Sequence, residues 1–141
     1  MKNKLLTIML IILVSITLIG VVALILVMQF NKDGEAEGPT IDEIIESSVD
    51  VPEITTNLSA DDFIRLSLKI QTDSVEAAEE LTKRDFQVKN IVIQELSEMS
   101  AADLEGKEGK QTFENALKLQ INELMHDGEV QQVYITSYII Q

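Results

Sequence analysis

The run of residues 5–28 is the feature that most limits what this chain can fold into. Its 24 residues include no charge and are almost all Leu, Ile, Val or Met. As a helix rising about 1.5 Å per residue, the run is roughly 36 Å long. That length crosses a hydrocarbon core of about 30 Å with some tilt, so the run predicts a transmembrane helix.

A cleaved signal peptide is the competing interpretation of the same run. Signal peptides carry about 7 to 15 apolar residues and end at a cleavage site of the small-x-small type. The present run is longer, and residues 27–30 (VMQF) offer no such site. The sequence therefore favours an anchor that stays attached to the rest of the chain.

The charges on either side of the run predict its orientation. Lys2 and Lys4 precede it, whereas Lys32 is followed by acidic residues at positions 33, 35 and 37. Because positively charged flanks stay in the cytoplasm, residues 1–4 are predicted to form a cytoplasmic tail. Residues 29–141 then lie outside, which predicts a single-pass membrane protein.

The charge of the outer part limits its ligands. The chain has 11 basic and 24 acidic residues; without Lys2 and Lys4, nine basic residues face all 24 acidic ones, a balance of −15. Such a charge argues against nucleic acid or an anionic membrane surface as a ligand. The chain has no cysteine, and an outer domain without disulfides is more typical of bacteria than of eukaryotic secreted modules.

Residues 29–50 are predicted to form an acidic linker that contains a short helix. Residues 40–43 (TIDE) have the pattern of a capping box, which begins a helix. Ile41, Ile44 and Ile45, with Val49, then follow one another at helical spacing. A helix this short is marginal alone in water, so it docks either on its own domain or on a partner. The sequence leaves both open and makes Ile41, Ile44 and Ile45 the candidate partner-binding residues.

Residues 51–141 are predicted to form one folded domain that opens with two strands. Residues 54–58 (ITTNL) form a first strand, and residues 59–62 (SADD) have the chemistry of a turn. Residues 63–72 alternate strictly between apolar and polar side chains. This period of two predicts a half-buried strand that pairs with the first one.

Helices and a final strand follow. Helical patterns run from residue 73 to about 84 and from 88 to 99, and a capping box at 100–103 precedes a long helix expected to end at Gly128. In the closing strand, Val133, Ile135 and Ile139 are predicted on one face and Tyr134 and Tyr138 on the other. The order strand, strand, three helices, strand predicts an α+β fold with one small core.

The motifs that carry chemistry in other proteins are incomplete here. Residues 106–111 (GKEGKQ) lack the first glycine and the final Ser or Thr of a phosphate-binding loop. His126 is the only histidine, so a metal site lacks further N or S ligands; it is expected at the end of the long helix, facing the dipole. Asp61 and Asp62 are interpreted as solvated turn residues. The sequence predicts a protein that is not an enzyme and has no cofactor, metal or small-molecule substrate.

Several short segments, in this order, resemble the FliL family of flagellar basal-body proteins. The likeness extends over residues 55–141 together with the short amino tail and the single span. Each segment alone is a weak signal, whereas their order and the ending of the chain make the resemblance specific. The segments are residues 56–58 (TNL), 91–97 (IVIQELS), 103–107 (DLEGK), 120–122 (QIN) and 133–141 (VYITSYIIQ).

The resemblance implies a single-pass protein of the cell (inner) membrane whose outer domain is similar to the stomatin/SPFH fold. It implies a homo-oligomeric ring around the flagellar stator, in contact with MotB and near MotA and the basal body, that supports stator engagement, torque, swimming and swarming. Tyr134, Tyr138 and Ile140 of the last strand become candidates for ring or sheet packing. The chain departs from the family in lacking a proline between Lys83 and Asn90. The alternative function is a membrane-anchored extracytoplasmic binding or sensor module unrelated to motility.

Overall fold

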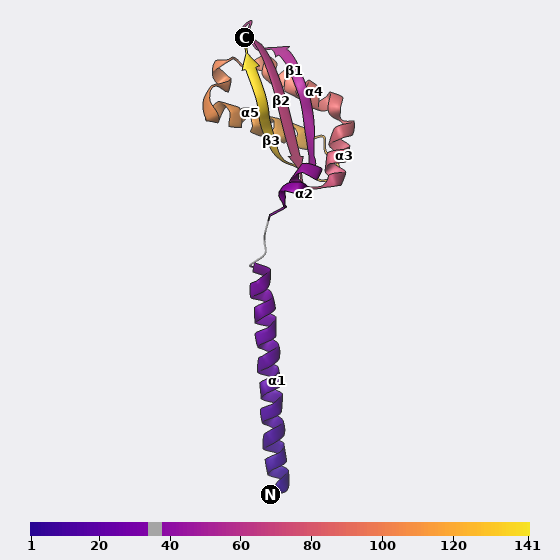
Figure 1. Cartoon of the computed structure of the whole chain (residues 1–141), viewed down its shortest axis with the longest axis vertical. Coiled ribbons are helices and arrows are strands. Elements are labelled where there is room, and N and C mark those ends of the chain that lie inside the picture. The colour runs from indigo at the N-terminus through magenta and orange to yellow at the C-terminus, as the bar shows by residue number, and fades with distance from the viewer. Residues whose placement is uncertain (34–37) are drawn as a thin grey trace. The chain divides into compact units, whose positions relative to one another are not determined.

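The computed structural model describes residues 1–33 and 38–141, with the side chains of residues 31–33 left aside. The chain divides into two compact units, Met1–Gly38 and Pro39–Gln141, and each is described by itself (Figure 1). The first unit is a helix and the second is an α+β domain.

The first unit consists of helix α1 (Lys2–Asp33). Its span Lys2–Phe30 is long and apolar enough to cross a membrane, and it contains the predicted run of residues 5–28. The hydroxyl groups of Thr7, Ser15 and Thr17 each donate to the carbonyl oxygen four residues earlier, at 2.7 to 2.8 Å. These bonds satisfy the three hydroxyl groups within the helix itself, so their polarity does not oppose a place in lipid.

The second unit is built on a three-stranded antiparallel sheet. Its strands are β1 (Ser48–Asn57), β2 (Phe63–Thr72) and β3 (Val130–Ile140). The sheet order is β1-β2-β3, so β2 lies in the centre and the last strand of the chain forms one edge. The α+β class and the order of strands and helices predicted from sequence are confirmed.

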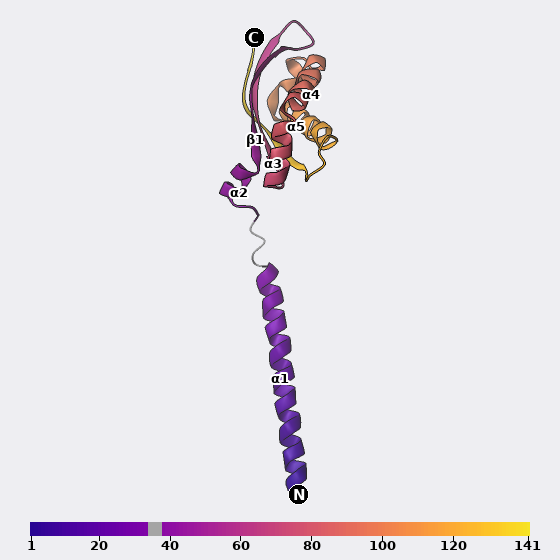
Figure 2. The ribbon, with the colours of Figure 1, turned by 90° about the vertical axis from the view of Figure 1, so that its right-hand side faces the viewer.

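The helices between β2 and β3 lie on one face of this sheet, and the opposite face is left uncovered by them (Figure 2). They are α3 (Val75–Lys83), α4 (Asp85–Glu98), the 3-10 turn η1 (Ala102–Leu104) and α5 (Gly106–Asn122). A shorter helix, α2 (Ile41–Glu46), precedes β1. The break between α3 and α4 falls at Arg84 without the help of a proline.

The core lies between the sheet and the three longer helices. Ile64, Leu66, Leu68 and Ile70 of β2 all point into it and are at most 2% exposed. Burial of each such side chain contributes on the order of 1.5 to 3 kcal/mol. They belong to one cluster with buried side chains of the helices, namely Leu81, Val88, Val92, Leu96, Phe113, Leu117 and Ile121.

Strand β1 begins earlier than the predicted strand of residues 54–58. It starts at Ser48, and a bulge at Pro52 and Glu53 joins its two halves, because Val51 lies opposite Leu68 and Ile54 lies opposite Leu66. A bulge on an edge strand tolerates a proline, which the sequence pattern alone does not show. Val49 therefore belongs to the sheet, and its assignment to the helical stripe was wrong.

Strand β3 contains a second bulge that changes the faces predicted for its end. Ser137 lies opposite Ser67 and Ile135 opposite Leu68, so Thr136 is the extra residue. One extra residue moves every following side chain to the other face. Tyr138 thus shares the helix-covered face with Val133 and Ile135, and Ile139 lies on the uncovered face with Tyr134. The predicted grouping of Ile139 with Val133 and of Tyr138 with Tyr134 was wrong.

The long helix is shorter than its apolar pattern suggested. Helix α5 ends at Asn122, and Gly128 lies in the following loop rather than at a helix end. Gly128 has φ +73°, a left-handed conformation, and a Cβ at this position would lie 2.2 Å from Asp73 Oδ1. Both the conformation and the close approach require glycine here.

We therefore expect Gly128→Ala to destabilise the folded domain. The left-handed conformation alone costs about 1 to 2 kcal/mol for a residue with a Cβ, and Asp73 has to move as well. Thermal unfolding of the detergent-solubilised full chain, followed by circular dichroism, measures the effect. Gly38→Ala is the matched control, since nothing lies within 4 Å of a Cβ at that position. Equal melting temperatures for the two variants would contradict the requirement for glycine at position 128.

Candidate interaction surfaces

Helix α2 is formed by the capping box that the sequence predicts. The Thr40 backbone N–H donates to Glu43 Oε2 at 2.7 Å, and the Glu43 N–H donates to Thr40 Oγ1 at 3.3 Å. The Thr40 backbone N–H, helped by its hydroxyl, holds the pKa of the Glu43 carboxyl below its usual value of 4.5. These two reciprocal bonds satisfy donors at the start of a helix that is too short to be stable alone.

The far end of α2 is fixed to the sheet. The backbone N–H of Thr72, at the end of β2, donates to the carbonyl of Ser47 at 2.8 Å, and its hydroxyl donates to the same oxygen at 2.6 Å. Thr72 is 2% exposed, so these bonds are shielded from water. The helix is therefore a fixed part of the same compact unit as the sheet.

The three candidate isoleucines of α2 do not lie in equivalent places. Ile44 is half-buried, whereas Ile41 is 68% exposed and Ile45 is 53% exposed. The helix thus docks on its own domain with Ile44 and presents Ile41 and Ile45 to the outside. Exposed isoleucines side by side on a helix that is held in place form a surface suited to a partner.

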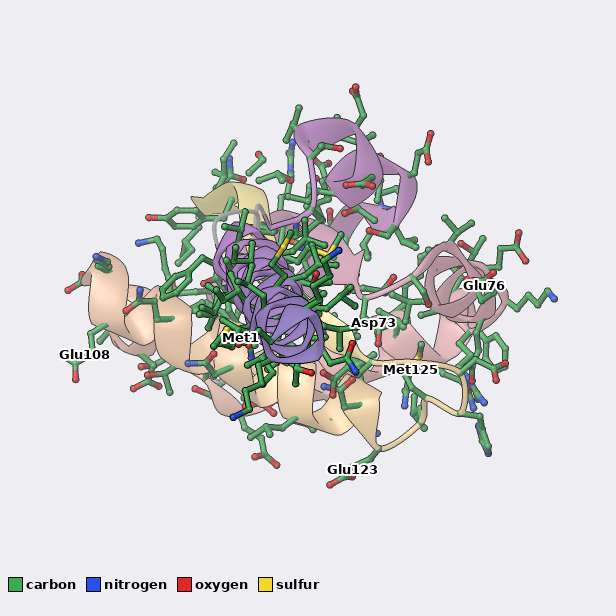
Figure 3. All side chains as sticks on the ribbon, turned by 90° about the horizontal axis from the view of Figure 1, so that it is seen from below. Met1, Asp73, Glu76, Glu108, Glu123 and Met125 are labelled. Carbon is green, nitrogen blue, oxygen red and sulfur yellow. The ribbon has the colours of Figure 1, made fainter. Side chains whose placement is uncertain are left out.

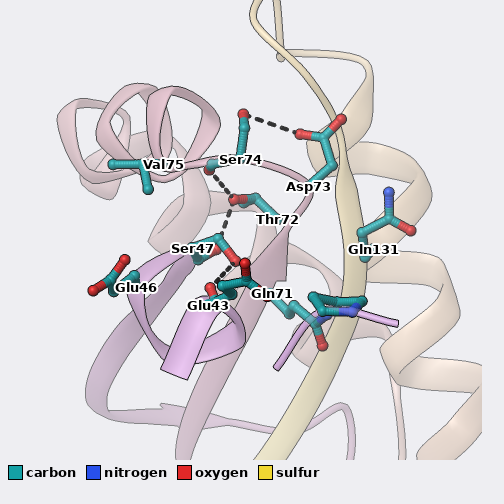
Figure 4. Close-up of a pocket in the computed structure, with 10 residues that line it drawn as sticks. Glu43, Glu46, Ser47, Gln71, Thr72, Asp73, Ser74, Val75 and Gln131 are labelled. Atoms are coloured by element: carbon teal, nitrogen blue, oxygen red, sulfur yellow. Dashed lines mark hydrogen bonds between the residues drawn. The ribbon is translucent and has the colours of Figure 1, made fainter. Parts of the chain in front are cut away.

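An open cavity of about 660 Å³ lies beside α2 (Figure 4). It is bordered by the end of β2 and the beginning of α3. Two of its carboxylates are already bonded, Glu43 to Thr40 and Asp73 to the Glu129 N–H at 3.1 Å. The residues that line it are Pro39, Glu43, Glu46, Ser47, Gln71, Thr72, Asp73, Ser74, Val75 and Gln131.

No metal centre is formed by the residues that the structure describes. Nowhere among them do three His, Asp or Glu side chains gather closely enough to hold an ion. Many acidic side chains point outward instead, as Glu76, Glu108 and Glu123 do in Figure 3. Their separation favours hydration and solubility as the role of most of the negative charge.

Glu80 of α3 fixes the loop that leads into β3. Its carboxylate accepts the backbone N–H of Asp127 at 2.7 Å and that of His126 at 3.1 Å, and Arg84 Nε donates to it at 2.8 Å. The Asp127 N–H above all, followed by Arg84 and the His126 N–H, lowers the pKa of Glu80 to about 2 against the opposing effect of its burial.

The only histidine belongs to this loop contact. Its side chain is 79% exposed, with Nδ1 at 2.9 Å from an Arg84 guanidinium nitrogen. The expected place of His126 at the end of the long helix was wrong, because α5 already ends at Asn122. His126 therefore contacts Glu80 and Arg84 from the loop and does not face the dipole of helix α5.

We expect Glu80→Gln to reduce stability at neutral pH and to matter less as the pH falls. A carboxyl whose pKa is lowered from 4.5 to about 2 stabilises the fold above pH 4.5 and loses that contribution between pH 4.5 and 2. The melting temperatures of the unaltered protein and of the Glu80→Gln variant, measured from neutral pH down to pH 2, give the difference in stability. Glu79→Gln is the control, since Glu79 is exposed and makes no hydrogen bond within the described residues. A difference in melting temperature that is independent of pH would contradict a stabilising role for the negative charge of Glu80.

The candidate residues of the last strand have three different environments. Tyr134, on the uncovered face, is 44% exposed and donates its hydroxyl to Gln71 Oε1 at 3.0 Å. Tyr138 is 42% exposed on the helix side, where Lys110 Nζ lies 4.6 Å from the centre of its ring. Ile140 packs against the core. The three residues therefore do not form one surface.

The uncovered face of the sheet includes residues that the sequence analysis did not select. Phe63 and Ile139 are each 51% exposed there, and Arg65 lies opposite Ile139. The position of Phe63 on this face could have been predicted from the sequence, since Phe63 alternates with the buried Ile64. The position of Ile139 could not, because the bulge at Thr136 leaves no local sequence signal.

Comparison with known proteins assigns the folded unit to a family. The family model described as flagellar basal body-associated protein FliL matches residues 48–141. The chain belongs to the FliL family. The match begins at the first residue of β1 and extends to the end of the chain, so it includes the entire sheet and the helices on it.

Two curated relatives agree with this assignment. The flagellar protein FliL of Bacillus subtilis (strain 168) is 54% identical over 102 residues, which are 72% of this chain and 73% of the relative. The flagellar protein FliL of Aquifex aeolicus (strain VF5) is 22% identical over 79 residues, 56% of this chain and 49% of that one. FliL is a flagellar accessory family and not a known enzyme family, which fits the prediction of a protein that is not an enzyme.

Proposed function

We propose that this FliL-family chain is a non-catalytic scaffold of the flagellar motor, anchored in the cell membrane with its domain outside. In this proposal, copies form a ring around the stator and support stator engagement, torque, swimming and swarming. The observation that carries the proposal is the match of residues 48–141, the sheet and the helices between its strands, to a basal-body family. The surfaces described above support a role in binding other proteins.

The anchor supports both the location and the assembly. Lys2 and Lys4 before α1 favour a cytoplasmic amino terminus, which leaves the domain extracytoplasmic. Anchored copies diffuse in two dimensions, which raises the effective concentration for lateral contacts. Free domains with this negative charge repel one another, and weak contacts do not hold them together. Between anchored copies, contacts of the same strength are sufficient for assembly.

The partners proposed are the stator proteins MotB and MotA together with further copies of this chain. Helix α2 is the proposed docking site for MotB, because Ile41 and Ile45 are exposed on a helix that the Ser47 carbonyl and Thr72 hold in place. Docking would bury these two side chains without first having to order them, which lowers the entropic cost of binding.

The second candidate is an anchored extracytoplasmic binding or sensor module. The cavity of about 660 Å³ beside α2 favours it, since small-molecule sites are concave and of this size. Its open form fits a ligand pocket less well. Loss of the gene separates the two functions, because only the motor scaffold predicts a specific defect in motility.

We expect Ile41→Glu combined with Ile45→Glu to impair swimming and swarming while the protein stays folded and abundant. Two carboxylates on an exposed helix leave the core intact but make the docking surface unsuitable for an apolar partner. Colony expansion in soft agar and immunoblots of membranes measure motility and abundance.

Phe86→Glu is the matched control for this experiment, because Phe86 is an exposed apolar residue (71%) on α4, away from α2. A photo-crosslinking residue at Ile45 should capture MotB or a second copy in the native organism. Normal motility of the Ile41/Ile45 variant, together with capture of neither protein, would refute docking through α2.

A further inference from the structure

On each edge of the sheet, one half of the strand is protected against pairing with another strand (the closed half), and the other half is not (the open half). Strands β1 and β3 are the edge strands of the unit, since β2 lies between them. An edge strand presents unpaired N–H and C=O groups, and proteins usually block such an edge. Here blocking devices are found on one half of each strand and are missing from the other half.

The first half of β3 is closed by side chains of α5. Asn122 Oδ1 accepts the Val130 N–H at 2.6 Å, and Asn122 Nδ2 donates to the Val130 carbonyl at 3.2 Å. Glu114 Oε1 accepts the Ile135 N–H at 3.0 Å. These are outward-facing backbone groups, and their bonds to side chains oppose the pairing of another strand with this half.

The first half of β1 is closed by its sequence. Pro52 has no N–H and lies in the bulge, which distorts the edge. Asp50 and Glu53 add exposed charges on either side of it. Proline, a bulge and charges are the features by which natural sheets prevent pairing between edges.

The last half of β3, residues 137–140, is open. Gln141 and Phe63 exchange both of their backbone hydrogen bonds, each at 2.8 Å. Because backbone direction alternates along a strand, Tyr138 and Ile140 point their N–H and C=O groups away from β2. No side chain of the described residues bonds to these groups.

The last half of β1, residues 54–57, is open in the same way. The Leu58 N–H donates to the Asp62 carbonyl across the turn at 2.8 Å, so Leu58 points its backbone inward. By the same alternation, Thr55 and Asn57 point their backbone groups outward. Both residues are exposed, and no described side chain bonds to their backbone.

The two open halves match each other in their position along β2 (their level), in their direction and in their lack of charge. Ile54 and Tyr138 both lie opposite Leu66, and Thr56 and Ile140 both lie opposite Ile64. Both strands are antiparallel to β2 and therefore parallel to each other. Although the chain has a net charge of −13, neither ITTN nor SYII contains a charge, and both are rich in residues that favour strands.

We propose that residues 137–140 of one copy pair, as parallel strands, with residues 54–57 of a neighbouring copy. The sheet then continues from one copy to the next. This inference rests on the proposed function, since it states how the copies of the ring contact one another. The contact joins two different edges, so it repeats from copy to copy and forms a ring where the rotation closes. Backbone hydrogen bonds supply the affinity, as in other cases of strand addition.

The experiment uses the absence of cysteine from the chain. Thr55→Cys and Ile139→Cys are introduced together into the full-length protein, and native membranes are oxidised. Both positions lie opposite Arg65, on the uncovered face of the sheet. We expect a ladder of disulfide-linked multimers from the double variant and no linked product from either single variant. Coexpression of the two single variants should give dimers only.

The matched control is the double variant Asp50→Cys with Tyr134→Cys. These positions also share one level, opposite Lys69, but lie in the closed halves of the strands. The control should give no ladder. Asn57→Pro added to the Thr55/Ile139 double variant removes one outward N–H and should reduce the ladder several-fold, with folding checked by circular dichroism.

The outcomes separate this inference from the proposed function. Dimers from a single cysteine, an equal ladder from the control, or a link only to another protein would overturn the pairing of open edges between copies. A missing ladder would also overturn it, and the proposed function would stand if deletion of the gene still impairs motility. Normal motility after deletion would refute the proposed function itself.

Discussion

The central strand β2 is the constraint on which the rest of the domain depends. Its four inward side chains are almost fully buried, and the helices form a single cluster with them. Its backbone pairs with both other strands. Within the sheet, the first strand and the last one, more than seventy positions apart, are therefore joined through β2. Their registers against it decide which residues of the edges lie at the same level.

The bulges in β1 and β3 determine which surfaces the domain presents. Each adds one residue and thereby reverses the faces of everything beyond it. The reversal in β3 puts Tyr138 beneath Lys110 and leaves Ile139 exposed. The bulge at Pro52 and Glu53 and the one at Thr136 also separate a closed half of an edge from an open half. One local irregularity thus changes both the face of the sheet and the accessibility of its edge.

The domain fits a scaffold because its distinctive features are surfaces. Helix α2 is held to the sheet through the Ser47 carbonyl and still exposes two isoleucines, and Glu80 and Asp73 hold the loop before β3 in place. Rigid surfaces lose little entropy when they bind. For the scaffold proposed for this member of a basal-body family, an anchor in the membrane makes modest surfaces sufficient for assembly.

The sequence alone determined the apolar span, the order of strands and helices, the capping box of α2 and the family. All of these depend on local periodicity or on short motifs, which are readable without knowing what packs against them. Only the tertiary structure decided the faces at the end of β3, the burial of Ile44 relative to Ile41 and Ile45, and the closing of one edge by Glu114 and Asn122. These depend on register between strands distant in sequence, and a single extra residue changes that register without any local signal.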